Sequence, residues 1–210
     1  MTAAGNRRFS WNLRFVSLLT SFSAALEARD PYLQGHSTRV TAFAEALARL
    51  LGWHRSELEA LRLGGSLHDV GKIAVDAGIL RKPGPLTAAE LAHIRTHPLA
   101  GAHLIDGVAD LLPALPYVLH HHERWDGKGY PDGKAADQIP VEARLLGVAD
   151  AFDAMTSHRP YRRALTVERA LAEVERCAGT QFDPELALTF VEGWHRGEIG
   201  AAAPALAISR

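Results

Sequence analysis

Two stretches of the chain gather side chains that bind transition metals. His68 and Asp69 are adjacent, and further along residues 121–131 read His-His-Glu-Arg-Trp-Asp-Gly-Lys-Gly-Tyr-Pro. Imidazole nitrogens and carboxylate oxygens without thiolates suit divalent metals that keep open positions for water. These residues therefore point to a metal-dependent hydrolase.

Asp150 adds to this pattern because of its place on an expected helix. It shares one face with Leu146, Gly147 and Ala154, at offsets of three or four residues. That face should point inward, and a buried carboxylate is costly unless it is paired or bound to metal. A metal is the simplest explanation. Isolated histidines carry less information, since most are surface or satisfied core residues. We give that ordinary interpretation to His54, His93, His103, His158 and His195.

The composition limits the classes of protein that remain. A chain of 210 residues buries one substantial core, and a net charge of −1 provides no field that would recruit a long nucleic acid. The single cysteine, Cys177, excludes a disulfide framework and fits a reducing cytoplasm. Arg7 and Arg8 before the apolar run Phe15–Leu26 superficially resemble a signal peptide. The run has helical spacing and is too short to span a bilayer, so we expect an amphipathic helix in a cytoplasmic protein without a membrane span.

The elements that must position these side chains read as helical nearly throughout. We expect one all-α domain over residues 15–198, after an N-terminal extension (1–14) and before a flexible tail (199–210). Capping residues and prolines set several of the boundaries. Besides the first run, the expected helices cover residues 36–51, 55–71, 87–97, 115–121, 141–157 and 184–194.

Several blocks of the sequence resemble one known family. His68-Asp69 resembles the signature doublet of the HD phosphohydrolase superfamily, and residues 121–131 resemble the HHExxDGxGYP motif of its HD-GYP subgroup without a mismatch. Similar flanking blocks extend the likeness over roughly residues 15–192; they are Arg29-Asp30, Gly35–Ser37, Leu67–Lys72, Lys82–Gly84, Ala149-Asp150 and Arg159–Arg162. The resemblance implies an HD-type helical bundle with a metal centre in its core.

The resemblance also implies a ligand set. The expected ligands are His36, His68, Asp69, His97, His121, His122 and Asp150, with Asp69 bridging two ions. The register against Glu123 and Asp126 selects His121 and His122 and leaves His120 as a bystander. Some family members carry a Glu for a third metal where this chain has Tyr32, so we expect two divalent ions. The likeness favours iron or manganese, while nickel, cobalt and zinc are also compatible with nitrogen and oxygen ligands.

Such a centre would carry out phosphoester hydrolysis. Two ions about 3.5–4 Å apart lower the pKa of water, and the resulting hydroxide attacks phosphorus in line. We expect Asp69 and Lys72 to act in catalysis, with Lys72 adding charge at a phosphoryl oxygen. The alternative for Lys72 is an ordinary helix-end lysine. Glu123, Asp126 and Asp153 are expected to orient ligand histidines, although Asp153 equally fits a solvent-facing position.

Substrate contacts are expected from the loop and from the segment after the Asp150 helix. Tyr130 offers a stacking face for a base, and Arg159 and Arg162 suit phosphate oxygens and the guanine edge. The alternatives are a plain structural turn and ordinary salt bridges. By resemblance, the substrate is cyclic-di-GMP, which would be opened to pGpG and then cleaved to GMP.

Other interpretations stay open. The residues themselves indicate only a metal-assisted phosphodiester or phosphomonoester hydrolase, so the substrate can be another cyclic or linear nucleotide. A nucleotide-sensing or docking module is a non-enzymatic alternative, in which the Gly-Tyr-Pro loop engages diguanylate cyclase domains. The apolar N-terminal helix fits a homodimer contact and core packing equally well.

Overall fold

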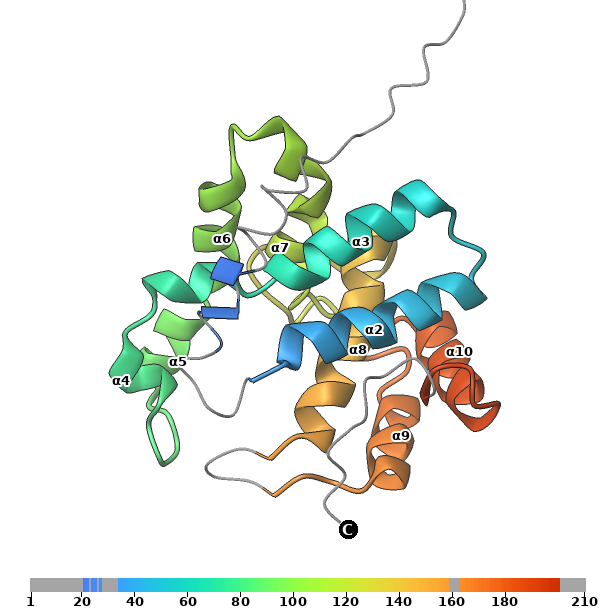
Figure 1. Cartoon of the computed structure of the whole chain (residues 1–210). Helices are drawn as coiled ribbons and strands as arrows, with labels where there is room; N and C mark the ends of the chain where they lie inside the picture. The colour runs from blue at the N-terminus through green and yellow to red at the C-terminus, as the bar shows by residue number, and fades with distance from the viewer. Residues whose placement is uncertain (1–20, 23, 26, 28–33, 159–162, 201–210) are drawn as a thin grey trace, which may run out of the picture.

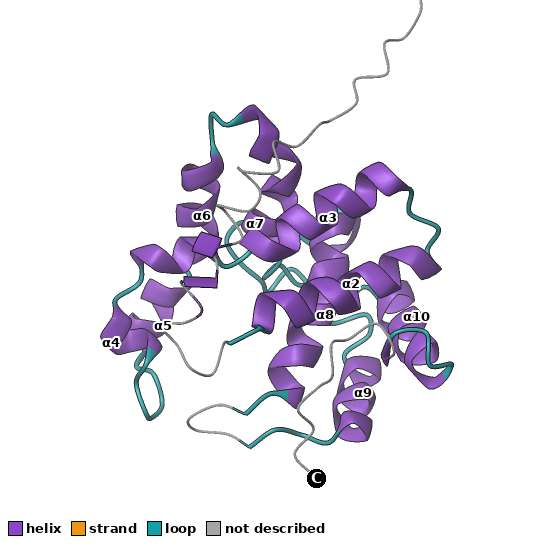
Figure 2. Ribbon diagram, in the orientation of Figure 1, coloured by secondary structure: helices purple, strands orange, loops and turns teal. Residues whose placement is uncertain are grey.

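The computed structural model of the chain describes residues 21–22, 24–25, 27, 34–158 and 163–200. These residues form helices joined by turns (Figure 2), and the described part of the chain has an isolated bridge between Ala178 and Phe182 but no strand. The expected all-α fold class is confirmed.

The helices vary from single turns to sixteen residues. The α-helices are α2 (His36–Leu50), α3 (Arg55–Leu67), α4 (Ala77–Leu80), α5 (Ala88–Ile94), α6 (His97–Ile105), α7 (Leu115–His120), α8 (Val141–Thr156), α9 (Val167–Arg176) and α10 (Pro184–His195). Three 3₁₀ turns lie between them: η1 (Val70–Ala74), η2 (Ala109–Ala114) and η3 (Ala136–Gln138).

The larger of two apolar clusters forms around α2. The apolar stripe of this helix, which recurs at offsets of three and four, is fully buried at Val40, Phe43 and Leu47. Helix α2 packs against both α3 and α8, while α6 and α7 lie on one side of this group and α9 and α10 on the other (Figure 1). Edge-to-face packing joins α2 to α8, where the ring centroids of Phe43 and Phe152 are 5.3 Å apart.

A second cluster joins α3, η1, α6 and α7. Its buried members on these four elements are Leu63, Leu67, Val70, Ile105 and Val118. The metal-binding candidates lie on elements from both clusters, so the packing of the whole domain sets the distances between them.

The structure ends two helices sooner than the sequence predicts. The helix expected over residues 55–71 ends at Leu67, and the chain then tightens into η1. The helix that begins after Thr87 ends at Ile94, because Pro98 opens the next helix from its first turn. Helices α6 and α9 were not expected at all, although Thr166 caps α9 through the backbone nitrogen of Arg169.

The expectations for the two ends of the chain can be compared with the structure only where residues are described. Most of the apolar run Phe15–Leu26 and all of residues 201–210 lie outside the described residues. Ile199, which we placed in the flexible tail, is fully buried in the larger cluster, so the packed domain reaches at least this residue. Among the described helices, none has the length and apolar character needed to cross a bilayer.

Gly71 allows η1 to approach α6 closely, and this contact provides a test of the packing. A Cβ atom at Gly71 would overlap the carbonyl oxygen of His97 and the backbone of Gly101, none of which can rotate away. We expect Gly71→Ala to lower the free energy of unfolding by about 3 kcal/mol or more, measured by urea denaturation. Gly84→Ala is the matched control, because that Cβ meets no atom within 4 Å; it should stay within about 0.5 kcal/mol of the parent. Equal stabilities of the two variants would contradict the close approach.

Candidate metal centre

The expected ligands stand at the ends of helices, with one exception. His36 opens α2, His68 and Asp69 follow α3, His97 opens α6, His121 and His122 follow α7, and Asp150 lies inside α8. A side chain at a helix end can reach inward without interrupting the helix, so several elements can place one group each in a common space. The structure brings these side chains together.

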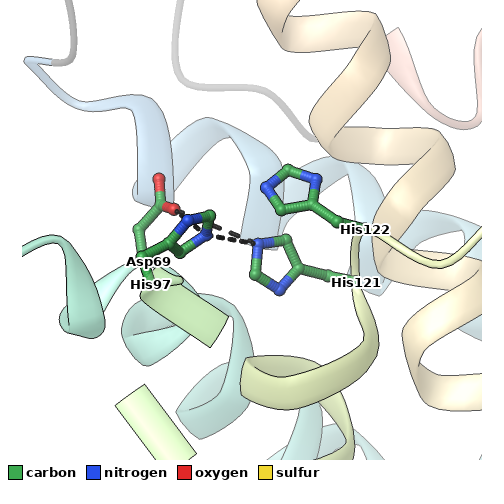
Figure 3. Close-up of side chains that lie close together, drawn as sticks. All are labelled: Asp69, His97, His121 and His122. Carbon is green, nitrogen blue, oxygen red and sulfur yellow. Dashed lines mark hydrogen bonds and ion pairs between the residues drawn. The ribbon is translucent and has the colours of Figure 1, made fainter. Parts of the chain in front are cut away.

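The carboxylate of Asp69 is at the middle of the group. Its Oδ1 lies 3.3 Å from His97 Nε2 and 4.0 Å from His121 Nε2 (Figure 3). Its Oδ2 lies 3.4 Å from His68 Nε2 and 3.8 Å from His36 Nε2. Asp69 therefore belongs to two groups of converging ligand atoms, one with His97, His121 and His122 and the other with His36 and His68.

Backbone carbonyls orient three of the imidazoles. The Nδ1 atom lies 2.8 Å from Gly65 O in His68, from Ile94 O in His97 and from Tyr117 O in His121. A carbonyl accepts only from a protonated nitrogen, so each ring carries a proton on Nδ1 and turns its Nε2 to the centre. Metal-binding histidines in proteins are held in this way.

His36 is oriented by a side chain instead. Its Nδ1 lies 2.7 Å from Oδ2 of Asp153, which is fully buried and also accepts from Arg39 at 2.6 and 3.0 Å. Its Nε2 faces Asp150 at 3.3 Å. Burial lowers the pKa of His36, but the two carboxylates outweigh burial and raise it to about 9. The structure thus places Asp153 behind His36, and Arg39 is a contributor that the sequence analysis missed.

Two buried atoms in the centre lack hydrogen-bond partners. His68 Nε2 and Asp69 Oδ1 are inaccessible to solvent and make no hydrogen bond in the described structure. Leaving such groups unpaired costs about 1–3 kcal/mol each. Both atoms are good ligands for divalent transition metals, and the neighbouring donors are also nitrogen or oxygen. The residues present therefore fit the binding of metal ions.

The protonation states of His121, His122 and Asp69 favour ligation as well. Burial, reinforced by His122 and His68, holds the pKa of His121 well below its usual value, and burial lowers the pKa of His122 to about 3. These rings are neutral at pH 7 and keep a free lone pair. Burial opposes ionisation of Asp69, but Lys72 at 2.6 Å and His68 hold its pKa well below the usual range.

The acidic residues of the 121–131 motif have a different role from the one expected. Asp126 makes a two-point ion pair with Arg124 and accepts from the backbone nitrogen of Lys128. Glu123 accepts from the backbone nitrogen of Asp132 at 2.8 Å. These bonds use the carboxylates to shape the loop, and a backbone carbonyl orients the neighbouring His121 instead. The expectation that Glu123 and Asp126 support those histidines directly is therefore corrected.

The loop folds back on the histidines through Gly129. The backbone nitrogen of Tyr130 donates to His122 O at 3.2 Å. A Cβ atom at Gly129 would collide with the backbone of residues 122–124, so only glycine fits there. The close approach at Gly129 is therefore one between two segments of the chain itself.

The expected substrate contacts are placed only in part. The Tyr130 ring stacks on His122 with centroids 4.8 Å apart, and the guanidinium of Arg95 lies 5.3 Å from its centroid. Lys72 reaches the centre from η1, as its ion pair with Asp69 shows. Arg159 and Arg162 lie outside the described residues, as does Tyr32, on which the expected number of ions rests.

A pocket with an empty volume of about 630 Å³ adjoins the centre. His122, Tyr130 and Asp150 line it on the side of the candidate ligands. Trp125 and Arg144 line the other side, where the guanidinium lies 5.5 Å from the indole centroid. The sequence analysis missed these two residues, because cation–π contacts between distant elements leave no local pattern.

Comparison with known proteins places this geometry in context. The sequence model of a family described as HD domain matches residues 20–186. The chain is 38% identical over 177 residues to the cyclic di-GMP phosphodiesterase response regulator RpfG of Xanthomonas campestris pv. campestris, covering 83% of this chain and 47% of RpfG. It is 36% identical over 168 residues to 3'3'-cGAMP-specific phosphodiesterase 3 of Vibrio cholerae, covering 80% of this chain and 36% of that protein.

A solved structure supports the fold. The crystal structure of a cyclic GMP-AMP specific phosphodiesterase from V. cholerae, V-cGAP3, superposes with a TM-score of 0.69 at 18% identity, covering 92% of this chain and 52% of that one. The chain spans from about a third to about half of the length of these two curated relatives.

Because Asp153 holds the His36 ring, we expect its side chain to affect metal affinity. Asp153→Asn removes the negative charge that holds the His36 ring, so we expect metal affinity to fall by about 10- to 100-fold. Equilibrium dialysis against Mn²⁺ measures the change, and circular dichroism checks that the variant is folded. Asp110→Asn, at an exposed position of η2, is the control and should bind like the parent. Parent-like affinity of Asp153→Asn would show that His36 needs no such support.

The lowered pKa values predict acid sensitivity of the metal-free protein. His122 takes up a proton near pH 6.5 when unfolded but only near pH 3 when folded, so the unfolded state binds more protons in this interval. Stability should fall as the pH drops from 6.5 to 4.5, by up to about 1.4 kcal/mol per pH unit for each such histidine. His36 is charged in both states below pH 6.5, and the aspartates of the centre contribute only near or below their usual 3.8.

Urea unfolding of chelator-treated protein at several pH values tests this expectation. His122→Gln should flatten the dependence, whereas His103→Gln, at an exposed position of α6, should leave it unchanged. A parent protein with equal stability at pH 6.5 and 4.5 would contradict the lowered pKa values.

Proposed function

The chain belongs to the HD domain family, and its HD doublet and GYP loop place it in the HD-GYP subgroup; from this premise we propose that it is a metal-dependent cyclic dinucleotide phosphodiesterase. We further propose cyclic-di-GMP as the substrate and pGpG as the product, with onward cleavage to GMP. The likeness to RpfG, whose name includes this substrate, supports the choice.

The observation that carries the proposal is the position of Asp69. Its carboxylate is shared by two groups of converging nitrogen and oxygen atoms, which fits two divalent ions held side by side. We propose His36, His68, Asp69 and Asp150 for one ion and Asp69, His97, His121 and His122 for the other. Ions bound there would activate water and neutralise charge on the phosphoryl oxygens. Iron and manganese are the favoured metals.

The residues around this centre have complementary tasks. The backbone carbonyls behind His68, His97 and His121 keep the Nε2 atoms pointing inward without rearrangement. Lys72 places its ammonium group 2.6 Å from Asp69, where it can also attract a phosphoryl oxygen. Tyr130 stacks on His122, has the Arg95 guanidinium 5.3 Å from its ring centroid and lines the pocket, where it would contact a bound nucleotide.

The likeness to the V. cholerae phosphodiesterase suggests a second candidate substrate. The V. cholerae protein is named for 3'3'-cGAMP, which differs from cyclic-di-GMP in one base. Both molecules have the same phosphodiester ring, so the centre formed by Asp69 and the histidines does not discriminate between them. We assign the discrimination to contacts with the bases, for which Arg159 and Arg162 are the candidates.

The loop also offers a surface for a partner protein. Lys128 is exposed at its tip, next to the Gly-Tyr-Pro segment. We propose that diguanylate cyclase domains dock on this segment, as an activity separate from hydrolysis. Lys128→Ala should then weaken binding to such a domain in a pull-down assay while hydrolysis continues.

Removal of one ligand tests the proposed activity. His97→Ala should lower kcat for cyclic-di-GMP by more than about 100-fold, a larger effect than that of residues which only support ligands. Product chromatography with manganese-reconstituted protein measures pGpG and GMP. His103→Ala is the control on the same helix; its side chain is exposed, and it should keep parent activity. Equal activity of the two variants would rule out the proposed centre.

Comparison of substrates separates the two nucleotides. The ratio of kcat/KM for cyclic-di-GMP and 3'3'-cGAMP decides which is preferred, because both are hydrolysed at the same centre. Faster turnover of 3'3'-cGAMP would replace the substrate and leave the reaction type intact. Absence of turnover with either nucleotide, in protein that binds two metal ions, would reject the phosphodiesterase proposal.

A further inference from the structure

A third cluster of ligand-type side chains lies outside the Asp69 centre. His120 is the last residue of α7, Glu123 follows in the next turn, and Asp132 comes after the Gly-Tyr-Pro segment. His120 Nδ1 lies 3.9 Å from Glu123 Oε1 and 3.9 Å from Asp132 Oδ2. One ligand atom from each residue lies within 4.8 Å of the other two. None of the three belongs to the expected ligand set of the main centre.

Two buried atoms of this cluster have no hydrogen-bond partner. The Glu123 side chain is fully buried, yet its Oε2 makes no hydrogen bond in the described structure. His120, which is 9% exposed, also leaves Nδ1 without a partner. The 3.9 Å separations are too long for hydrogen bonds and leave a gap between the polar atoms. A buried carboxylate and a buried imidazole without partners are energetically costly, and a group bound between them would remove this cost.

From this geometry we propose that His120, Glu123 and Asp132 form a further binding site for a zinc-class divalent cation. Imidazole nitrogens and carboxylate oxygens both bind zinc, and three protein ligands with water in the fourth position are an arrangement that zinc adopts. At metal–ligand distances of about 2.0–2.2 Å, tetrahedral ligands lie about 3.4 Å apart. The two 3.9 Å separations from His120 Nδ1 would therefore shorten by about half an ångström on binding. Asp132 can supply this movement because its side chain is 44% exposed.

Lys134 competes with a cation for this site. Its Nζ lies 3.1 Å from Asp132 Oδ2, so it neutralises one ligand when no ion is bound. The lysine is on the same loop and partly exposed, and its flexible stem lets the ammonium turn into solvent. Loss of its charge should strengthen cation binding, because two like charges would no longer share the Asp132 carboxylate.

The ion would connect α7 to the loop that carries Tyr130. His120 directly precedes the two histidines expected to bind the main centre, and Asp132 lies two residues after Tyr130. At present Glu123 makes this connection through the backbone nitrogen of Asp132. A cation would add two further bonds across the same junction and so fix the loop relative to His122.

Metal counting on the full chain tests the proposal. Chelator-treated protein is dialysed against Zn²⁺ at pH 7.5, and bound zinc per chain is measured by mass spectrometry of the metal. His120→Ala and Asp132→Asn should each bind one ion fewer than the parent. His103→Ala, which removes an exposed histidine, should match the parent and so excludes adventitious binding at that position. Lys134→Met should bind the additional ion roughly tenfold more tightly.

Using both His120→Ala and Asp132→Asn separates loss of the site from an indirect effect on helix α7. His120→Ala alters the end of α7 next to His121, whereas Asp132→Asn lies outside any helix. Loss of one ion in both variants supports the site. Equal zinc content in the parent and Asp132→Asn overturns it. The result is read from a difference between proteins, so it does not depend on hydrolysis or on the number of ions in the main centre.

Discussion

Five imidazoles and two carboxylates share one buried space, and burial penalises every charge among them. Protons and partners are therefore distributed unevenly among these side chains. His121 and His122 remain neutral, whereas Asp69 stays ionised beside Lys72. One buried oxygen, Asp69 Oδ1, still lacks a hydrogen-bond partner within the described part of the chain. Divalent ions would satisfy this atom and the Nε2 atoms around it, so the same constraint explains both the composition and the shape of the centre.

The helices meet this constraint by ending next to the centre. Helix α3 stops before His68, and the 3₁₀ turn that follows brings Asp69 and Lys72 to one side of the space. Helix α6 starts at His97, where its approach to η1 depends on the missing side chain of Gly71. The carbonyls that end α3 and α7 would be unsatisfied in isolated helices, and they become the acceptors that orient the imidazoles.

The loop of residues 123–132 packs directly against the candidate metal centre and is fixed to the rest of the domain. Trp125 and Asp126 donate backbone hydrogen bonds to Gln181 and Thr180, which ties the loop to the segment before α10. Gly129 turns the chain back so that Tyr130 stacks on a candidate ligand. Any movement of this loop on substrate or partner binding would therefore change the packing around the His122 ring.

The sequence by itself determined the helical class and the boundaries of several helices, because hydrophobic period and capping residues are local properties of a chain. The candidate ligands came from the family resemblance that its motifs carry. Only the tertiary structure decided how those ligands are supported. The partnership of His36 with Asp153 spans 117 positions, and the use of Glu123 to hold Asp132 depends on how a loop closes. Such contacts follow from the packing of distant elements, on which residue spacing along the chain carries no information.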